Sequence, residues 1–171
     1  IISPDTIIQT TKAYKNYEGF SGDLIHVINA VREVAPDQPV SRIGVRYVNV
    51  IDLPSGSPLE WAEYINESML GIIDLHKDRK NVTRAFHILE LNFDPINLRF
   101  QFGIANPDYP AIVKRKQFIL DLDAYSMGAF EMSEIGSVID NSHSIIQNFF
   151  EQSITDKTRK MMKPKKDGSR K

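Results

Sequence analysis

The sequence predicts a soluble α+β protein, with an antiparallel or mixed sheet, helices packed on one face and a long C-terminal helix. Several segments alternate apolar and polar residues with the two-residue period of a half-buried strand. Two other segments repeat their apolar residues at spacings of three and four, as amphipathic helices do. The elements follow the order β-α-β-α-β-β-β-α, which lacks regular β-α-β alternation and so argues against a doubly wound fold.

The chain begins with a short predicted strand, followed by a helix. Residues 6–12 favour a strand because they are rich in β-branched side chains. The helix is marked by five apolar residues that fall on one stripe, Phe20, Leu24, Val27, Ile28 and Val31. Pro36 and Pro39 prevent this helix from continuing.

Residues 41–54 predict the central strand, because they are dense in β-branched and aromatic residues and end at a proline. The two-residue period places five residues on one face, Ile43, Val45, Tyr47, Asn49 and Ile51. The opposite face takes Arg42, Gly44 and Arg46. After this strand, Ser57 as an N-cap and Pro58 at the first helical position predict a short helix over residues 59–69.

The C-terminal half predicts three strands and the long helix. The strands cover residues 85–93, 97–104 and 117–125. The first two are joined at Asp94 and Pro95, a spacing that indicates antiparallel neighbours. The final helix begins near Ser133 and carries an apolar stripe, interrupted at Ser142, as far as Ile154. This helix is expected to be the main cover of the sheet.

Length and charge predict one domain, residues 1–156, followed by a basic flexible tail, residues 157–171. A chain of 171 residues usually makes a single domain. The tail holds eight of the 21 Lys and Arg but one of the 22 acidic residues, so it carries a charge of +7 and leaves −8 on the domain. An acidic domain is a poor nucleic-acid binder, so weak binding through the tail is the expected limit.

The first residue is Ile1 rather than Met, and strand-like sequence follows at once. We therefore expect this domain to be the C-terminal portion of a longer protein. No run of apolar residues approaches the length of a membrane span, so no membrane partner is expected. The chain contains no cysteine, which excludes disulfides, thiolate catalysis and zinc sites with sulfur ligands. This composition fits a cytoplasmic protein.

A dense set of charged residues is expected on the sheet face opposite the core. If the strands pair as their alternation suggests, this face presents Arg42, Arg46, Glu90, Arg99, Gln101, Asp121 and Asp123. The arginines could clamp a carboxylate or phosphate, or the two aspartates could hold a divalent metal. The simpler interpretation is a set of cross-strand ion pairs, each contributing about 0.2–1 kcal/mol.

Asn49 is the one polar residue that the alternation places on the apolar face of the central strand. A buried amide without a partner costs about 1–3 kcal/mol, so this side chain must be satisfied by neighbouring backbone or by a ligand. The four histidines form no catalytic or metal-binding spacing, and no nucleophile or phosphate-loop motif is present. We therefore predict no catalytic residue, no metal site and no cofactor.

Four dispersed pieces of sequence resemble a known family. They are Ser3-Pro4-Asp5 with Tyr14-Lys15, then Arg42-Ile43-Gly44-Val45-Arg46-Tyr47-Val48-Asn49, then Leu120-Asp121-Leu122-Asp123, and finally Phe150-Glu151 with Ile154-Thr155-Asp156. Together they resemble the C-terminal two thirds of a sporadically distributed bacterial family of uncharacterised proteins. The Arg-x-Gly-x-Arg-Tyr-x-Asn string is the most specific piece. The resemblance implies an N-terminal β-containing segment, but no reaction, cofactor or partner.

Two functional hypotheses follow from the sequence. The first is a non-enzymatic binding or protein-interaction module of the bacterial cytoplasm, which meets a protein partner or a second copy of itself. The alternative is a small-molecule or anion-binding protein, or an enzyme, that uses Arg42, Arg46, Asp121 and Asp123. A flat face filled by mutual salt bridges would favour the first hypothesis. A partly enclosed pocket over these residues would favour the second.

Overall fold

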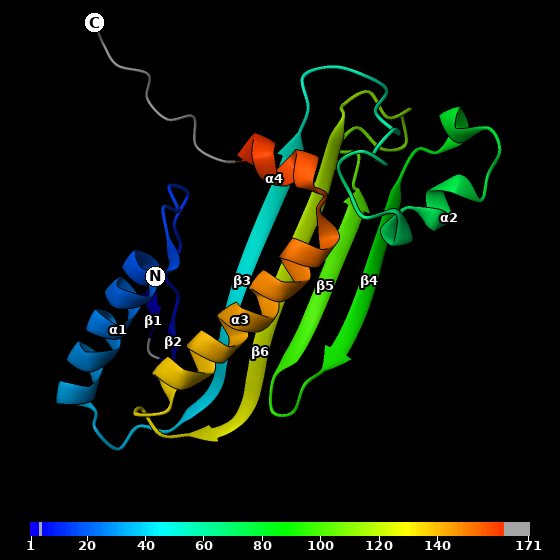
Figure 1. The fold of residues 1–171 in the computed structure, drawn as a ribbon. Coiled ribbons are helices and arrows are strands. Elements are labelled where there is room, and N and C mark those ends of the chain that lie inside the picture. Colours follow the sequence, from blue (N-terminus) through cyan, green and yellow to red (C-terminus); the bar gives the residue numbers. More distant parts are fainter. Residues whose placement is uncertain (4, 163–171) are drawn as a thin grey trace, which may run out of the picture.

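The computed structural model describes residues 1–3 and 5–162, and it confirms the predicted α+β class with an antiparallel sheet. The main sheet has four strands in the order β3-β6-β5-β4, and all of its neighbours are antiparallel. The long helix α3 crosses one face of this sheet, and α1 lies on the β3 side (Figure 1). No helix in the described residues is long and apolar enough to span a membrane.

The strands are β1 (Ile2–Ser3), β2 (Thr6–Ile7), β3 (Val40–Asp52), β4 (Ala85–Asn92), β5 (Asn97–Ile104) and β6 (Gln117–Phe130). The helices are α1 (Tyr17–Val34), α2 (Gly71–Asp74), α3 (Ile135–Ser153) and α4 (Asp156–Met162), together with the 3-10 turns η1 (Glu67–Met69) and η2 (Arg79–Asn81).

One face of the sheet forms the core and is called the helix face here. Strand β6 lies in the interior of the sheet, and its helix-face side chains are fully buried, Phe118, Leu120, Leu122, Ala124 and Ser126. The predicted alternation in β3 holds, because Ile43, Val45 and Ile51 are buried on the same face. Helix α3 packs on β6 and β3, as expected for the main cover of the sheet. The buried face of α3 is continuous, since Ser142, which interrupts its apolar stripe, is also fully buried.

The predicted helix over residues 59–69 is wrong. Residues 53–66 form turns, and only the short 3-10 turn η1 follows them. Tertiary contacts explain the difference, because Ile65 pairs in an isolated β-bridge with Ile154, and the backbone N–H of Asn66 donates to Ser153 O at 2.9 Å. These contacts hold the backbone extended at Ile65 and Asn66, where a helix would otherwise continue. Trp61 and Ile65 are buried and complete the core beside Phe118.

The predicted strand over residues 6–12 is also largely wrong. Only Thr6 and Ile7 are paired, and their partners Ser3 and Ile2 belong to a separate two-stranded hairpin. Ile7 and Ile8 are exposed, so this segment has no buried face that would hold it in the main sheet.

The first residues of the predicted basic tail are helical and packed. Residues 156–162 form α4, and Thr158 is fully buried. Its hydroxyl donates a hydrogen bond of 2.6 Å to Tyr64 O. This helix is therefore part of the folded domain, and the rest of the predicted tail, residues 163–171, lies outside the described residues.

Replacement of Ile65 by Ala tests the contribution of the irregular segment to the core. Ile65 has no exposed surface, so Ile65→Ala should lower the free energy of unfolding by about 2–5 kcal/mol. Ile72→Ala is the matched control, because Ile72 is 56% exposed and its change should stay within about 0.5 kcal/mol. Urea denaturation measures both. Equal effects would show that residues 53–66 do not complete the core.

Candidate interaction surface

The sheet face opposite α3, called the open face here, carries six of the seven predicted site residues. They form an ion-pair belt of Arg42, Arg46, Glu90, Arg99, Asp121 and Asp123. The strand register explains how they meet. Arg46 lies opposite Asp123, Asp123 lies opposite Arg99, and Arg99 lies opposite Glu90. One row across all four strands therefore alternates in charge.

Arg46 and Asp121 form the closest pair of the belt. The guanidinium donates two hydrogen bonds to the carboxylate, Nε to Oδ1 at 2.8 Å and Nη2 to Oδ2 at 2.6 Å. The Asp121 side chain is only 9% exposed, whereas that of Arg46 is 55% exposed. These hydrogen bonds raise the pKa of Arg46. The bidentate pair thus places a guanidinium over a buried carboxylate and fixes its orientation.

The other pairs of the belt are looser. Arg42 reaches Asp123 at 3.7 Å, with its guanidinium 5.1 Å from the centre of the Tyr125 ring. Gly44 permits this path, because a Cβ at that position would lie 3.0 Å from Nη1 of Arg42. The guanidinium of Arg99 is 3.5 Å from the Glu90 carboxylate. Each belt arginine is therefore already paired with a carboxylate in an ion pair.

The belt is balanced in charge, with three arginines and three carboxylates. A site that binds anions needs positive charge left over, and a metal site needs several oxygen ligands directed at one point. Within residues 1–3 and 5–162, no group of three or more His, Asp and Glu side chains could hold a metal ion. The arrangement is a network of mutual salt bridges.

Asn49 lies on the helix face, apart from the other six predicted residues. Its side-chain nitrogen donates to Leu120 O on the neighbouring strand at 3.4 Å. Leu120 is also its direct pairing partner in the β3–β6 register. The sequence left open whether neighbouring backbone or a ligand satisfies this amide, and the structure shows neighbouring backbone as the acceptor.

The open face also carries apolar side chains in two neighbouring register rows, called the apolar rows here, that the sequence reasoning did not identify. In one row Val48 of β3 and Ile88 of β4 lie at the two ends with Asp121 and Gln101 between them, and the next row contains Val50, Ile119 and Phe86. All of these apolar side chains except Ile119 are exposed. A signal for them was present, because Val48 and Val50 continue the alternation that places Arg42, Gly44 and Arg46 on this face.

Gly103 sits between Ile119 and Phe86 in the second row. Its φ is +131°, and a Cβ there would lie 2.1 Å from the Ala85 carbonyl oxygen. A side chain is therefore excluded at this position, and the backbones of β4 and β5 approach closely.

A second polar cluster joins α1 to β3 and α3 on the helix side. The Tyr17 ring stacks on His143 with centroids 3.7 Å apart, and its hydroxyl donates to Asp140. The Tyr47 hydroxyl lies 3.2 Å from His143 Nδ1 and 3.4 Å from the Tyr14 hydroxyl. Burial lowers the pKa of His143 and raises the pKa of both Tyr17 and Tyr47. Burial thus favours the uncharged forms of His143, Tyr17 and Tyr47, and the cluster anchors α1.

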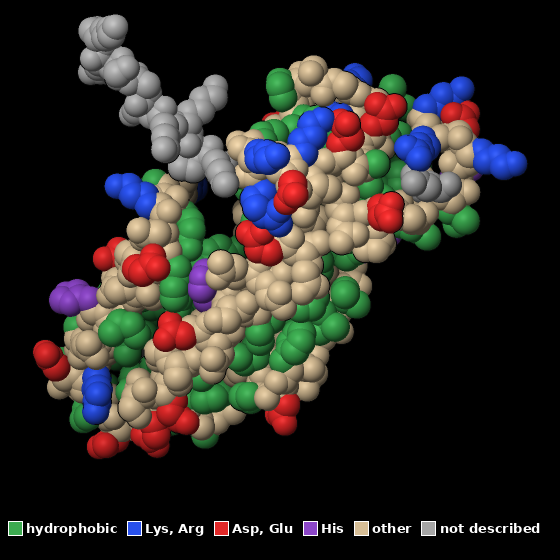
Figure 2. Space-filling view, viewed as in Figure 1, with side chains coloured by type: hydrophobic (Ala, Val, Ile, Leu, Met, Phe, Trp, Pro, Cys, Tyr) green, Lys and Arg blue, Asp and Glu red, His purple; other side chains and the backbone are tan. Residues whose placement is uncertain are grey.

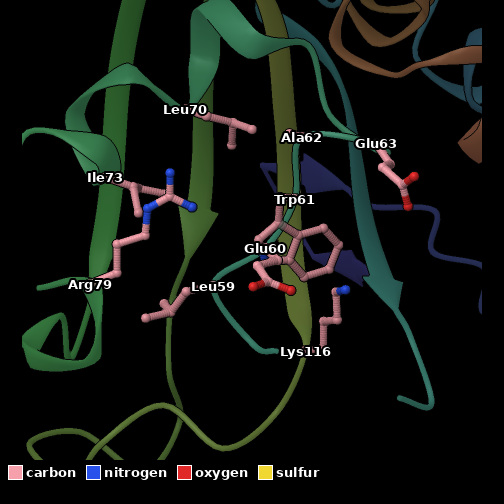
Figure 3. A pocket seen from close by; sticks show the side chains of 9 residues that line it. All are labelled: Leu59, Glu60, Trp61, Ala62, Glu63, Leu70, Ile73, Arg79 and Lys116. Atoms are coloured by element: carbon pink, nitrogen blue, oxygen red, sulfur yellow. The ribbon is translucent and has the colours of Figure 1, made fainter. Parts of the chain in front are cut away.

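A cavity of about 290 Å³ lies between the irregular segment and the start of β6 (Figure 3). Trp61, Leu70 and Ile73 line its apolar side, and charged side chains surround them, Glu60, Glu63, Arg79 and Lys116. The Lys116 ammonium lies 5.2 Å from the centre of the Tyr64 ring. None of the predicted site residues lines this cavity.

Comparisons with known proteins identify no relative. No family model matches the chain, no curated protein matches it, and no solved structure matches it. The resemblance to the bacterial family therefore stays a prediction. The geometry of the two faces carries the functional argument that follows.

The belt predicts unequal costs for the loss of Arg46 and of Arg99. Arg46→Ala should lower the free energy of unfolding by about 1–3 kcal/mol, because it leaves the buried Asp121 carboxylate without its charged donor. Arg99→Ala should cost at most about 1 kcal/mol, because its partner Glu90 is largely exposed. Chemical denaturation measures the free energy of unfolding of both variants. A larger loss for Arg99→Ala would contradict this description of the belt.

Proposed function

We propose that this chain is a non-enzymatic protein-interaction module whose open sheet face binds a protein partner. One observation carries the proposal. Two pairs of exposed apolar side chains, Val48 with Val50 on β3 and Phe86 with Ile88 on β4, lie on the open face beside a belt whose charges already neutralise one another.

The apolar rows have the properties of an interface centre. Apolar surface left in water is unfavourable by about 25 cal/mol per Å², so covering these rows would release free energy. Side chains scattered singly need no explanation, but contiguous exposed apolar patches commonly mark interaction sites. Here Val48 and Val50 lie two positions apart along β3, and Phe86 and Ile88 lie two positions apart along β4, so the sheet holds two exposed apolar pairs rigidly on one face.

The ion-pair belt has the properties of an interface rim. Protein interfaces typically combine an apolar centre with a polar, partly solvated margin. Because Arg46 and Asp121 already satisfy one another, a partner need not supply a compensating charge. The exposed part of the Arg46 side chain remains free to contact a partner's rim.

The alternative function, an anion-binding protein or enzyme built on Arg42, Arg46, Asp121 and Asp123, has less support. Those residues are paired with one another in ion pairs, and the cavity of Figure 3 lies elsewhere. The module is proposed to work in the cytoplasm, for which the absence of cysteine is suitable.

Charge placed in the apolar rows tests the proposal. Val50→Glu should reduce capture of a stoichiometric protein partner from native lysate by about ten-fold or more, because a carboxylate would be buried without a donor. Ile72→Glu is the matched control, since Ile72 is 56% exposed against 50% for Val50 and belongs to α2. Quantitative mass spectrometry of the captured proteins gives the amount of partner that each variant captures relative to the unmodified chain.

Two results would contradict the proposal. The first is capture that Val50→Glu and Ile72→Glu leave equally unchanged, because the open face would then not be the binding surface. The second is a protein that captures no partner and is also monomeric by light scattering.

A further inference from the structure

Strand β4 is an end strand of the main sheet, and its outer edge is free in the described residues. The order β3-β6-β5-β4 gives it one neighbour, β5, along all eight of its residues. In an antiparallel sheet, alternate backbone N–H and C=O groups of an end strand point away from the sheet. Such an edge is a template for a further strand.

Both faces of β4 are poorly covered by the rest of the chain. Phe86 and Ile88 are exposed on the open face. Leu89 is exposed on the helix face, and so is Phe93 just beyond the strand. The reason is that α3 packs mainly on β3 and β6, which leaves β4 less covered than the other strands. Figure 2 shows the resulting gathering of hydrophobic side chains over the β4–β5 half of the helix side.

The usual protection of a free edge is missing from β4. Natural edge strands are blocked by lysine, by proline or by a bulge. Strand β4 has the sequence AFHILELN, in which Glu90 is the one formal charge and is paired with Arg99. Its register with β5 runs without a shift. The other end strand, β3, carries Arg42 and Arg46 and has a register shift near Val40, and α3 packs against it.

We infer that β4 pairs antiparallel with β4 of a second copy of this chain, so that one sheet continues across a dimer. An extended strand is the occupant that can satisfy the free backbone groups. A second copy fits because a two-fold axis brings the same edge to itself and closes at two subunits. Apolar side chains then meet apolar side chains on both faces. With Glu90 as the one charge, like charges oppose each other only if the axis passes through Glu90 itself.

The symmetry also limits the register of the pair. A two-fold axis normal to the sheet places the open faces of the two copies on the same side of the continued sheet. Directly opposed residues must then point to the same face, so one residue of β4 lies opposite the same residue of the second copy. We infer that this residue is Ile88 or Leu89, because these lie at the middle of the strand and give the longest overlap. The inference deepens the proposed function and rests on it, since the dimer joins the apolar rows of two open faces into one surface.

The lack of cysteine in the chain allows a direct test by disulfide cross-linking. Single variants Ile88→Cys and Leu89→Cys are oxidised with glutathione disulfide beside the control Val50→Cys. Opposed residues of antiparallel strands have Cα atoms about 4.5–5.5 Å apart, within the range that a disulfide spans. The central β4 cysteine should cross-link about ten-fold or more faster than Val50→Cys, although Val50 is 50% exposed and Ile88 is 55% exposed.

Light scattering gives the second measurement. The unmodified chain should show twice the mass of one chain, Ile88→Lys should show the mass of one chain, and Val50→Lys should stay dimeric. Circular dichroism confirms that each variant is folded, as expected for exposed positions.

Three outcomes would overturn the inference. One is equal, slow cross-linking at positions 50, 88 and 89, and another is a single-chain mass at all accessible concentrations. The third is a mass that keeps growing with concentration, which would indicate β4-to-β3 filaments. A monomer that still loses its partner through Val50→Glu would reject the dimer and leave the proposed function standing.

Discussion

The antiparallel pairing of β3 with β6 is the constraint on which the rest of the structure depends. It runs from Val40 opposite Phe130 to Asp52 opposite Gln117. A shift by one residue would exchange the two faces, because side chains alternate along a strand. The observed register buries the apolar helix-face residues Ile43, Val45 and Ile51 of β3, together with those of β6, under α3. The same register sets Arg46 diagonal to Asp121, so one pairing determines both the core and the ion-pair belt.

The uneven cover of the sheet follows from the same pairing. A helix of 19 residues covers the two long strands, and β4 receives no comparable cover in the described part of the chain. The exposure of Leu89 on the helix face of β4 follows from this uneven cover. A domain of this size can remain folded with such a surface, but the uncovered area favours association. Proposed binding and proposed dimerisation both use this surface.

The sequence was sufficient for the regular elements and insufficient for contacts between distant segments. The alternation of Ile43, Val45 and Ile51 is a local pattern and predicts the buried face of β3 directly. The helix predicted at residues 59–69 failed because Ile65 pairs with Ile154, a contact that no local pattern contains. The charged face was predicted, but the partner of each charge required the register. The cluster around His143 joins residues of three elements that are far apart in the sequence, so no local spacing of residues could predict it.

Amide hydrogen exchange of β4 by NMR, at several protein concentrations, tests the central claim that this bare edge pairs with its own copy. The account predicts that the β4 amides directed away from β5 gain about ten-fold protection or more as the dimer forms, while β3 is unchanged. Exchange of β4 amides that does not depend on concentration, and that stays as fast as at a solvent-exposed edge, would contradict it.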